Sequence, residues 1–206
     1  MKNEESGLQG AGALLPSFSA VILAGGKSSR MGRDKAFIEL DGRSLIQRQV
    51  QLVREAGARE VFVSGKPGAD YPVPDCAVLE DEHADAGPLA GIERALASAT
   101  QPLLLVLAVD MPAMTAGFIR AMIAASRGGA GVVPRVDGLI EPLAAVYPRV
   151  AQPLAVGLLD KKQFAVTRFA EQCAAMRLLA FQDLPAAASV YFTNWNSPSD
   201  ISPCPN

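Results

Sequence analysis

The chain has 206 residues, of which 50% are hydrophobic, and its formal net charge at pH 7 is −2. This length suits one large α/β domain or two small ones, and the hydrophobic content supports a sizeable core. The mild acidity argues against a general nucleic-acid-binding or membrane-binding surface, because such a surface needs a broadly basic face.

Targeting signals and disulfide patterns are not predicted. Small residues and glycine dominate residues 1–17, which we expect to form a flexible tail ahead of a single domain at residues 18–206. No apolar stretch is long and clean enough to span a bilayer. The three cysteines (Cys76, Cys173 and Cys204) lack metal-site or disulfide spacing, which predicts buried thiols and a cytoplasmic location.

Strands and helices alternate along the chain. Apolar runs predict strands at residues 20–23, 60–65, 77–80, 102–110, 130–134, 143–148, 177–182 and 189–194. Helices are predicted at residues 45–56, 88–99, 116–127 and 149–172, the last with a break at Asp160. This alternation predicts an α/β fold with a Rossmann-like, doubly wound, mostly parallel sheet. Such sheets bind ligands outside the carboxyl ends of their strands.

The first predicted strand runs into a glycine turn and a basic cluster. Gly25 and Gly26 precede four cations, which are Lys27, Arg30, Arg33 and Lys35. A Walker A loop is excluded because it needs glycine at Val21, and the G-x-G-x-x-G spacing is also missing. Glycines still let the backbone approach a phosphate, while Arg30 and Lys35 can add charge-assisted hydrogen bonds. The alternative is a solvent-exposed basic loop.

The segment "LAGGKSSRMGRDKA" resembles the signature L-A-G-G-x-S-x-R-M-G-x-D-K of the MobA-like nucleotidyltransferases. Four more segments agree with that family in order, and together they span residues 20–201: "EDEHADAGPLAG", "LAVDMP", "EPLAAVYP" and "FTNWNSPSDI". The resemblance implies the nucleotide-diphospho-sugar transferase fold, with a GTP site and a molybdopterin site.

The implied reaction transfers GMP from GTP to the terminal phosphate of molybdenum-loaded molybdopterin and releases pyrophosphate. Transient contact with proteins that supply or accept the cofactor is also expected. One alternative is a cytidylyltransferase acting on the same pterin, although those relatives usually read L-A-A-G where this chain has Gly25. The others are a sugar or alcohol-phosphate nucleotidyltransferase, and a non-catalytic relative, against which the presence of both Lys35 and Asp110 argues.

Asp110 ends the most apolar predicted strand, where a carboxylate would face the ligand crevice. Its hard oxygen atoms suit Mg²⁺, the expected cofactor, whereas the plainer alternative is a carboxylate that caps the next turn. The resemblance implies that Asp110 is the Mg²⁺ ligand and that Lys35 contacts the nucleotide phosphates. We also expect Arg30 and Lys35 to be catalytic, by stabilising charge on the leaving pyrophosphate. Further nucleotide contacts are implied at Leu23, Ala24, Gly25, Gly26 and Asp81.

The carboxyl-terminal motif adds Asn194 and Asn196, which the resemblance places in the active-site region and which we assign to the pterin substrate. Trp195 departs from the smaller aliphatic residue usual between them, so its side chain either packs in the core or faces the pocket. Glu141 and Pro142 match a family segment that lines the cleft, and strand packing explains them equally well. His83, the single histidine, lies in an acidic segment with poor support for a metal site.

Overall fold

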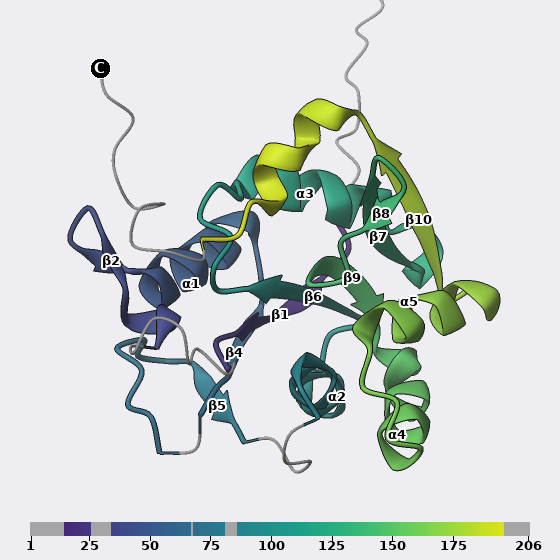
Figure 1. Ribbon diagram of the computed structural model, residues 1–206, viewed down its shortest axis with the longest axis horizontal. Coiled ribbons are helices and arrows are strands. Elements are labelled where there is room, and N and C mark those ends of the chain that lie inside the picture. The colour runs from purple at the N-terminus through teal and green to yellow at the C-terminus, as the bar shows by residue number, and fades with distance from the viewer. Residues whose placement is uncertain (1–14, 26–33, 67, 81–85, 196–206) are drawn as a thin grey trace, which may run out of the picture.

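The computed structural model describes residues 15–25, 34–66, 68–80 and 86–195 (Figure 1). Its strands are β1 (Phe18–Leu23), β2 (Glu39–Leu40), β3 (Arg43–Ser44), β4 (Glu60–Ser64), β5 (Ala77–Leu79), β6 (Leu103–Ala108), β7 (Gly131–Val136), β8 (Leu139–Ile140), β9 (Ala144–Pro148) and β10 (Leu179–Leu184). Its α-helices are α1 (Leu45–Ala56), α2 (Pro88–Ser98), α3 (Ala116–Ala125), α4 (Gln152–Asp160) and α5 (Val166–Ala175). The short 3-10 helices include η1 (Lys35–Phe37) and η4 (Ala186–Phe192).

The main sheet has eight strands in the order β10-β7-β9-β6-β1-β4-β5, with β8 paired to β7. Strand β1 runs parallel to β4 and to β6, and β4 runs parallel to β5. At the other end of the sheet, β10 runs parallel to β7. Strand β9 runs antiparallel to both β6 and β7. The predicted mostly parallel α/β sheet is therefore confirmed, with one reversed strand in its middle.

Helices cover both faces of the sheet. Helices α1 and α3 pack over one face, and α2, α4 and α5 lie over the other (Figure 1). Each face buries its own apolar cluster, because alternate residues of a strand point to opposite sides. In the central strand β1, for example, Ile22 belongs to one cluster and Val21 to the other, and both are fully buried.

The carboxyl ends of three parallel strands lie abreast. Leu23 at the end of β1 pairs with Ser64 of β4 on one side and with Ala108 of β6 on the other. The chain leaves β1 toward β4 through α1, whereas β6 lies on the opposite side of β1. The strand order therefore reverses at β1, which is the kind of position where open α/β sheets bind their ligands.

One predicted strand is replaced by a helix in the structure. The predicted strand at residues 189–194 is wrong, because this segment belongs largely to η4. Ala188 and Phe192 are its buried residues, whereas Val190 between them is 53% exposed, so alternate residues do not share one buried face as they would in a strand. The predicted break at Asp160 is confirmed, since α4 ends there and α5 begins at Val166. Of the predicted tail, residues 15–17 precede β1 and residues 1–14 lie outside the described residues.

In the described part of the chain, no helix is long and apolar enough to cross a membrane. Of the cysteines predicted to be buried, Cys173 is fully buried, and this burial raises the pKa of its thiol to about 12. Cys76 is only partly buried, and Cys204 lies outside the described residues.

Candidate active site

The turn after β1 is fixed to its two neighbouring strands by backbone hydrogen bonds. The amides of Ala24 and Gly25 both donate to the carbonyl oxygen of Ser64, at 2.7 and 3.1 Å. On the other side, the amide of Val109 donates to the carbonyl oxygen of Leu23 at 3.1 Å. The predicted nucleotide-contacting residues Leu23, Ala24 and Gly25 therefore form one rigid wall at the carboxyl edge of the sheet.

These bonds change how the turn can serve a ligand. Because the amides of Ala24 and Gly25 are already bonded to Ser64, they cannot also point at a phosphate. The glycine at position 25 has a second use, since it leaves an exposed surface without a side chain. Among the described residues, the nearest atoms that a Cβ built there would meet belong to Gly65 and Ser64, at ordinary contact distances of 3.8–3.9 Å. In the part of the chain that the structure describes, the surface above Gly25 therefore has room for a flat ligand.

Lys35 and Asp110 meet at this edge, although 75 residues separate them in the sequence. The Nζ atom of Lys35 lies 2.7 Å from Oδ2 of Asp110, and each side chain is 19% exposed. Lys35 is positioned by η1, at whose start the Asp34 carboxylate accepts a hydrogen bond from the amide of Ala36. Lys35, one residue of the predicted basic cluster, therefore lies in the site and not on a solvent-exposed loop.

Two contacts hold the loop that carries Asp110. The backbone amide of Trp195 donates to the carbonyl oxygen of Asp110 at 2.9 Å. The buried side chain of Gln49, on α1, donates through Nε2 to the carbonyl oxygen of Met111 at 2.8 Å. Trp195 itself packs against the core cluster beneath α1, which answers the question that this residue posed. Its exposed neighbour Asn194 is thereby brought to the carboxyl edge beside Asp110.

The loop after β4 forms a further wall that the sequence did not predict. Lys66 pairs through Nζ with Oδ2 of Asp34 at 3.1 Å, and its backbone amide donates to the hydroxyl oxygen of Tyr71 at 3.0 Å. The Tyr71 ring stacks on Phe37 of η1, with ring centroids 5.5 Å apart. Lys66 follows the carboxyl end of β4, so the rule that located Asp110 after β6 could also have located it.

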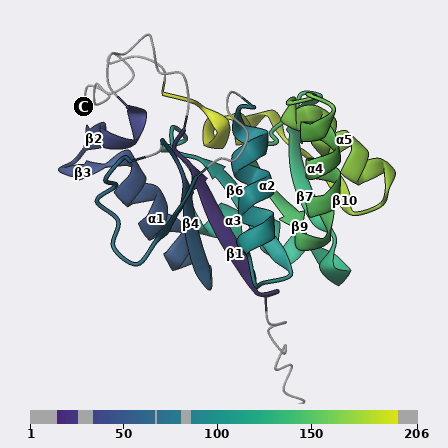
Figure 2. The same cartoon turned by 90° about the horizontal axis from the view of Figure 1, so that it is seen from below.

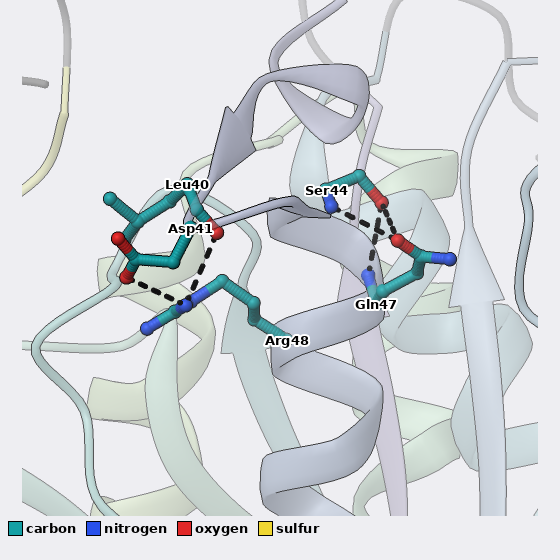
Figure 3. Close-up of polar contacts among 5 residues, drawn as sticks. All are labelled: Leu40, Asp41, Ser44, Gln47 and Arg48. Atoms are coloured by element: carbon teal, nitrogen blue, oxygen red, sulfur yellow. Dashed lines mark hydrogen bonds and ion pairs between the residues drawn. The ribbon is translucent and has the colours of Figure 1, made fainter.

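The chain returns from η1 to α1 through the β2–β3 hairpin, whose turn is held down on the helix (Figure 3). Arg48 donates to the carbonyl oxygen of Leu40 at 3.3 Å and lies 3.5 Å from the Asp41 carboxylate. At the helix start, the side chain of Ser44 accepts from the amide of Gln47, whose own side chain accepts from the Ser44 amide. This capping box ties the segment carrying Lys35 to α1, whose apolar face is buried.

The remaining predicted site residues lie outside the described residues. These are Gly26, Arg30, Asp81 and Asn196.

Asp110 can be compared with the ligands that a divalent metal ion requires. No group of three His, Cys, Asp or Glu side chains forms a metal site in the described ranges. Mg²⁺ is usually bound by one or two carboxylates together with water and substrate phosphates, so a single partly exposed Asp110 carboxylate at a ligand-binding edge fits it.

Comparisons with known proteins show the family to which this chain belongs. The family model of the MobA-like NTP transferase domain matches residues 20–175. A probable molybdenum cofactor guanylyltransferase of Opitutus terrae is 39% identical over 187 residues, which cover 89% of this chain and 93% of the relative. A molybdenum cofactor guanylyltransferase of Xanthomonas euvesicatoria is 40% identical over 111 residues, covering 53% and 56% of the two chains.

A solved structure shows the same fold. The molybdopterin-guanine dinucleotide biosynthesis protein A from Archaeoglobus fulgidus superposes with a TM-score of 0.69 at 21% identity. The match covers 89% of this chain and 94% of that protein. The family model spans most of the described sheet, from β1 through α5, and so includes both Lys35 and Asp110. The chain therefore belongs to the MobA-like NTP transferase family.

Proposed function

We propose that this protein is a molybdenum cofactor guanylyltransferase, which transfers GMP from GTP to the terminal phosphate of molybdenum-loaded molybdopterin. The observation that carries the proposal is the meeting of Lys35 and Asp110 at the point where the strand order reverses. The names of the relatives support the choice of substrates, since both curated relatives are described as guanylyltransferases.

The proposed reaction is a displacement at the α-phosphorus of GTP. An oxygen of the terminal phosphate of molybdopterin forms the new bond, and the bond from the α-phosphorus to the bridging oxygen breaks. Pyrophosphate leaves with that electron pair. A phosphate monoester has a second pKa of about 6, so the nucleophile is already mostly ionised at neutral pH and needs no general base. The task of the protein is to position two polyanions and to offset their charge.

Lys35 supplies the fixed positive charge. Its ammonium group is held at the site by η1 on one side and by the Asp110 carboxylate on the other, so it can donate to phosphate oxygens with little reorganisation. Arg30 is expected to act on the pyrophosphate side with it. Asp110 would hold the divalent metal, which we expect to be Mg²⁺ and which, when bound, would neutralise charge around the α-phosphate.

The walls of the site suggest how the substrates divide it. Gly25 leaves room for a purine base on the side of β1 and β4. We assign the exposed Asn194, whose neighbour Trp195 is hydrogen-bonded to Asp110, to the pterin, and we expect Asn196 to act with it. The nucleophile and the α-phosphorus would then meet between the two walls, near Lys35 and Asp110.

The test is pyrophosphate release with GTP, CTP, ATP and UTP in the presence of Mg²⁺, each with and without molybdenum-loaded molybdopterin. We expect release only when GTP and the pterin are both present. A preference for CTP would reassign the protein to cytidylyl transfer and show that Gly25 does not select a purine. Absence of release with all four nucleotides from folded protein would contradict the proposed activity.

A further inference from the structure

Glu141 lies on the same edge of the sheet as Asp110, one strand further from β1. Strands β6 and β9 are paired from Leu103–Pro148 to Leu107–Ala144. A hydrogen bond of 2.9 Å from the amide of Ala108 to the carbonyl oxygen of Leu143 continues this register by one step. Two residues further along each segment stand Asp110 and Glu141, so the alignment brings these two residues to the same end of neighbouring strands.

The backbone of Glu141 is fixed at both of its polar groups. Its amide donates to the carbonyl oxygen of Pro134 in β7 at 2.9 Å. Its own carbonyl oxygen accepts from the amide of Ala144 at 3.2 Å, where β9 begins. Glu141 therefore lies in the short turn between β8 and β9, and its backbone is hydrogen-bonded to β7 and to the start of β9. Binding groups are usually supported by such a fixed backbone.

The side chain of Glu141 has no partner within the described ranges. It is partly buried, and no hydrogen bond or ion pair there involves its carboxyl group. By contrast, two other acids near this edge are paired, Asp110 with Lys35 and Asp34 with Lys66. Burial raises the pKa of the Glu141 carboxyl, and neither Asp110 nor Lys35 contributes to this shift. A carboxylate withdrawn from water without a partner is costly, which makes it a candidate for binding a ligand.

We infer that Glu141 binds the aminopyrimidinone edge of the pterin substrate, accepting hydrogen bonds from its ring N–H and its exocyclic amino group. This inference rests on the proposed function. The edge presents two adjacent donors that match the two oxygens of one carboxylate. Guanine carries the same edge, but the space above Gly25 lies on the side of β1 and β4. Glu141 lies beyond β6 on the side of β9, so we assign it to the pterin, which accepts the GMP group.

The test compares Glu141→Gln with a matched control, Glu171→Gln, on an exposed position of α5. The KM for molybdopterin is measured at saturating GTP, and the KM for GTP at saturating molybdopterin. We expect the molybdopterin KM of Glu141→Gln to rise by roughly ten- to a hundredfold, the range for a lost charged hydrogen bond. Its kcat and GTP KM should stay within about twofold of wild type, and the control should change neither constant.

The outcomes separate the inference from the function on which it rests. A rise in the GTP KM in place of the molybdopterin KM would show that Glu141 binds guanine. If both KM values were unchanged, Glu141 would bind neither ring. Either result overturns the inference. Binding of 6-hydroxymethylpterin, followed by its fluorescence, needs no turnover. We expect wild type to bind it and Glu141→Gln to bind it at least tenfold more weakly. Equal or absent binding overturns the inference. If wild type binds the pterin but releases no pyrophosphate, the proposed function fails.

Discussion

The ammonium group of Lys35 lies in the candidate site, 2.7 Å from the Asp110 carboxylate. Lys35→Ala should lower kcat by at least about a hundredfold, because a preorganised donor to the transferring phosphates is lost. The fold should persist, since the Asp110 side chain keeps 19% exposure and can be solvated in the variant. The check is pyrophosphate release together with a thermal melt.

A matched control for Lys35→Ala is Lys161→Ala, at an exposed position just after α4. The control should retain both the activity and the melting temperature of wild type, because its ammonium group contacts no site residue among those described. Near-normal turnover in Lys35→Ala would contradict the assignment of Lys35 as a phosphate-binding residue. Loss of the folded state in that variant would show that the ion pair is chiefly structural.

A substitution at Gly25 tests the proposal that the guanine base lies against this residue. Its φ is not positive, and an added Cβ would make only ordinary contacts at 3.8–3.9 Å, so Gly25→Ala should melt within about 2 °C of wild type. The methyl group would occupy the space proposed for guanine, so the GTP KM should rise by about tenfold or more. Steady-state kinetics at saturating pterin measure this change. An unchanged GTP KM would place the base elsewhere.

The unpaired carboxyl of Glu141 predicts a pH-dependent stability. Because its pKa in the folded state is raised above the ordinary value of 4.5, the stability it allows is fully present below that pH. This stability is lost as pH rises through the raised pKa and the carboxyl ionises. Glu141→Gln should therefore melt above wild type at pH 7, and the difference should shrink on going to acid pH. A variant less stable than wild type at pH 7 would mean that the carboxylate has a stabilising partner.

Among the elements, α2 approaches the end of β4 so closely that Gly91 has no room for a side chain. A Cβ there would lie 2.1 Å from Oγ and 2.8 Å from Cβ of Ser64. Gly91→Ala should cost about 1–3 kcal/mol of unfolding free energy through overpacking, measured by urea denaturation. Adding Ser64→Gly should recover part of that loss, because it removes both clashing atoms.

Gly157 in α4 provides the control for the substitution at Gly91, since an added Cβ there meets nothing within 4 Å. Gly157→Ala should keep or increase stability, by up to about 1 kcal/mol from helix propensity. If Gly91→Ala behaved in the same way as Gly157→Ala, the close packing of α2 on the strand end would be wrong. The glycine would then have to be explained by a ligand rather than by the neighbouring strand.

The starts of two helices follow from N-cap residues that can be recognised in the sequence. Ser44 caps α1 and Thr115 caps α3, as their positions before apolar helical runs predict. The direction of β9 was not predicted, because an apolar run reports burial and not the orientation of its neighbours. A usable signal was present in Asp137–Gly138, whose positive φ angles of 50° and 82° make the β7–β8 turn. Asp-Gly between apolar residues is a strong hairpin signal.

The β2–β3 hairpin was missed for the same reason as the β7–β8 turn. Its turn residues are again aspartate and glycine, Asp41 and Gly42, with φ angles of 52° and 75°. Both Asp-Gly turns lie close in sequence to the site, one after Lys35 and the other before Glu141. A search for this dipeptide would have shown that each of these residues sits beside a chain reversal rather than in a long helix or strand.

For the whole molecule, the alternation of strands and helices was enough to predict that the residues of the candidate site lie at one edge of the sheet. A parallel sheet gathers the ends of its strands, so the glycine turn and Asp110 had to meet. The pairing of Lys66 with Asp34 and the stacking of Tyr71 on Phe37 were not predictable. They join segments whose mutual approach depends on the loop after β4, and no periodicity in the sequence encodes such contacts.

The proposed transfer requires attack on the α-phosphorus of GTP, and isotope labelling shows directly which phosphorus atom is attacked. Wild-type protein is incubated with Mg²⁺, molybdenum-loaded molybdopterin and GTP labelled with ³²P at either the α or the γ position, and the products are separated. We expect the α label in a pterin dinucleotide and the γ label in pyrophosphate. Transfer of the γ label to the pterin, or release of the α label as free GMP without a pterin product, would contradict the proposed guanylyl transfer.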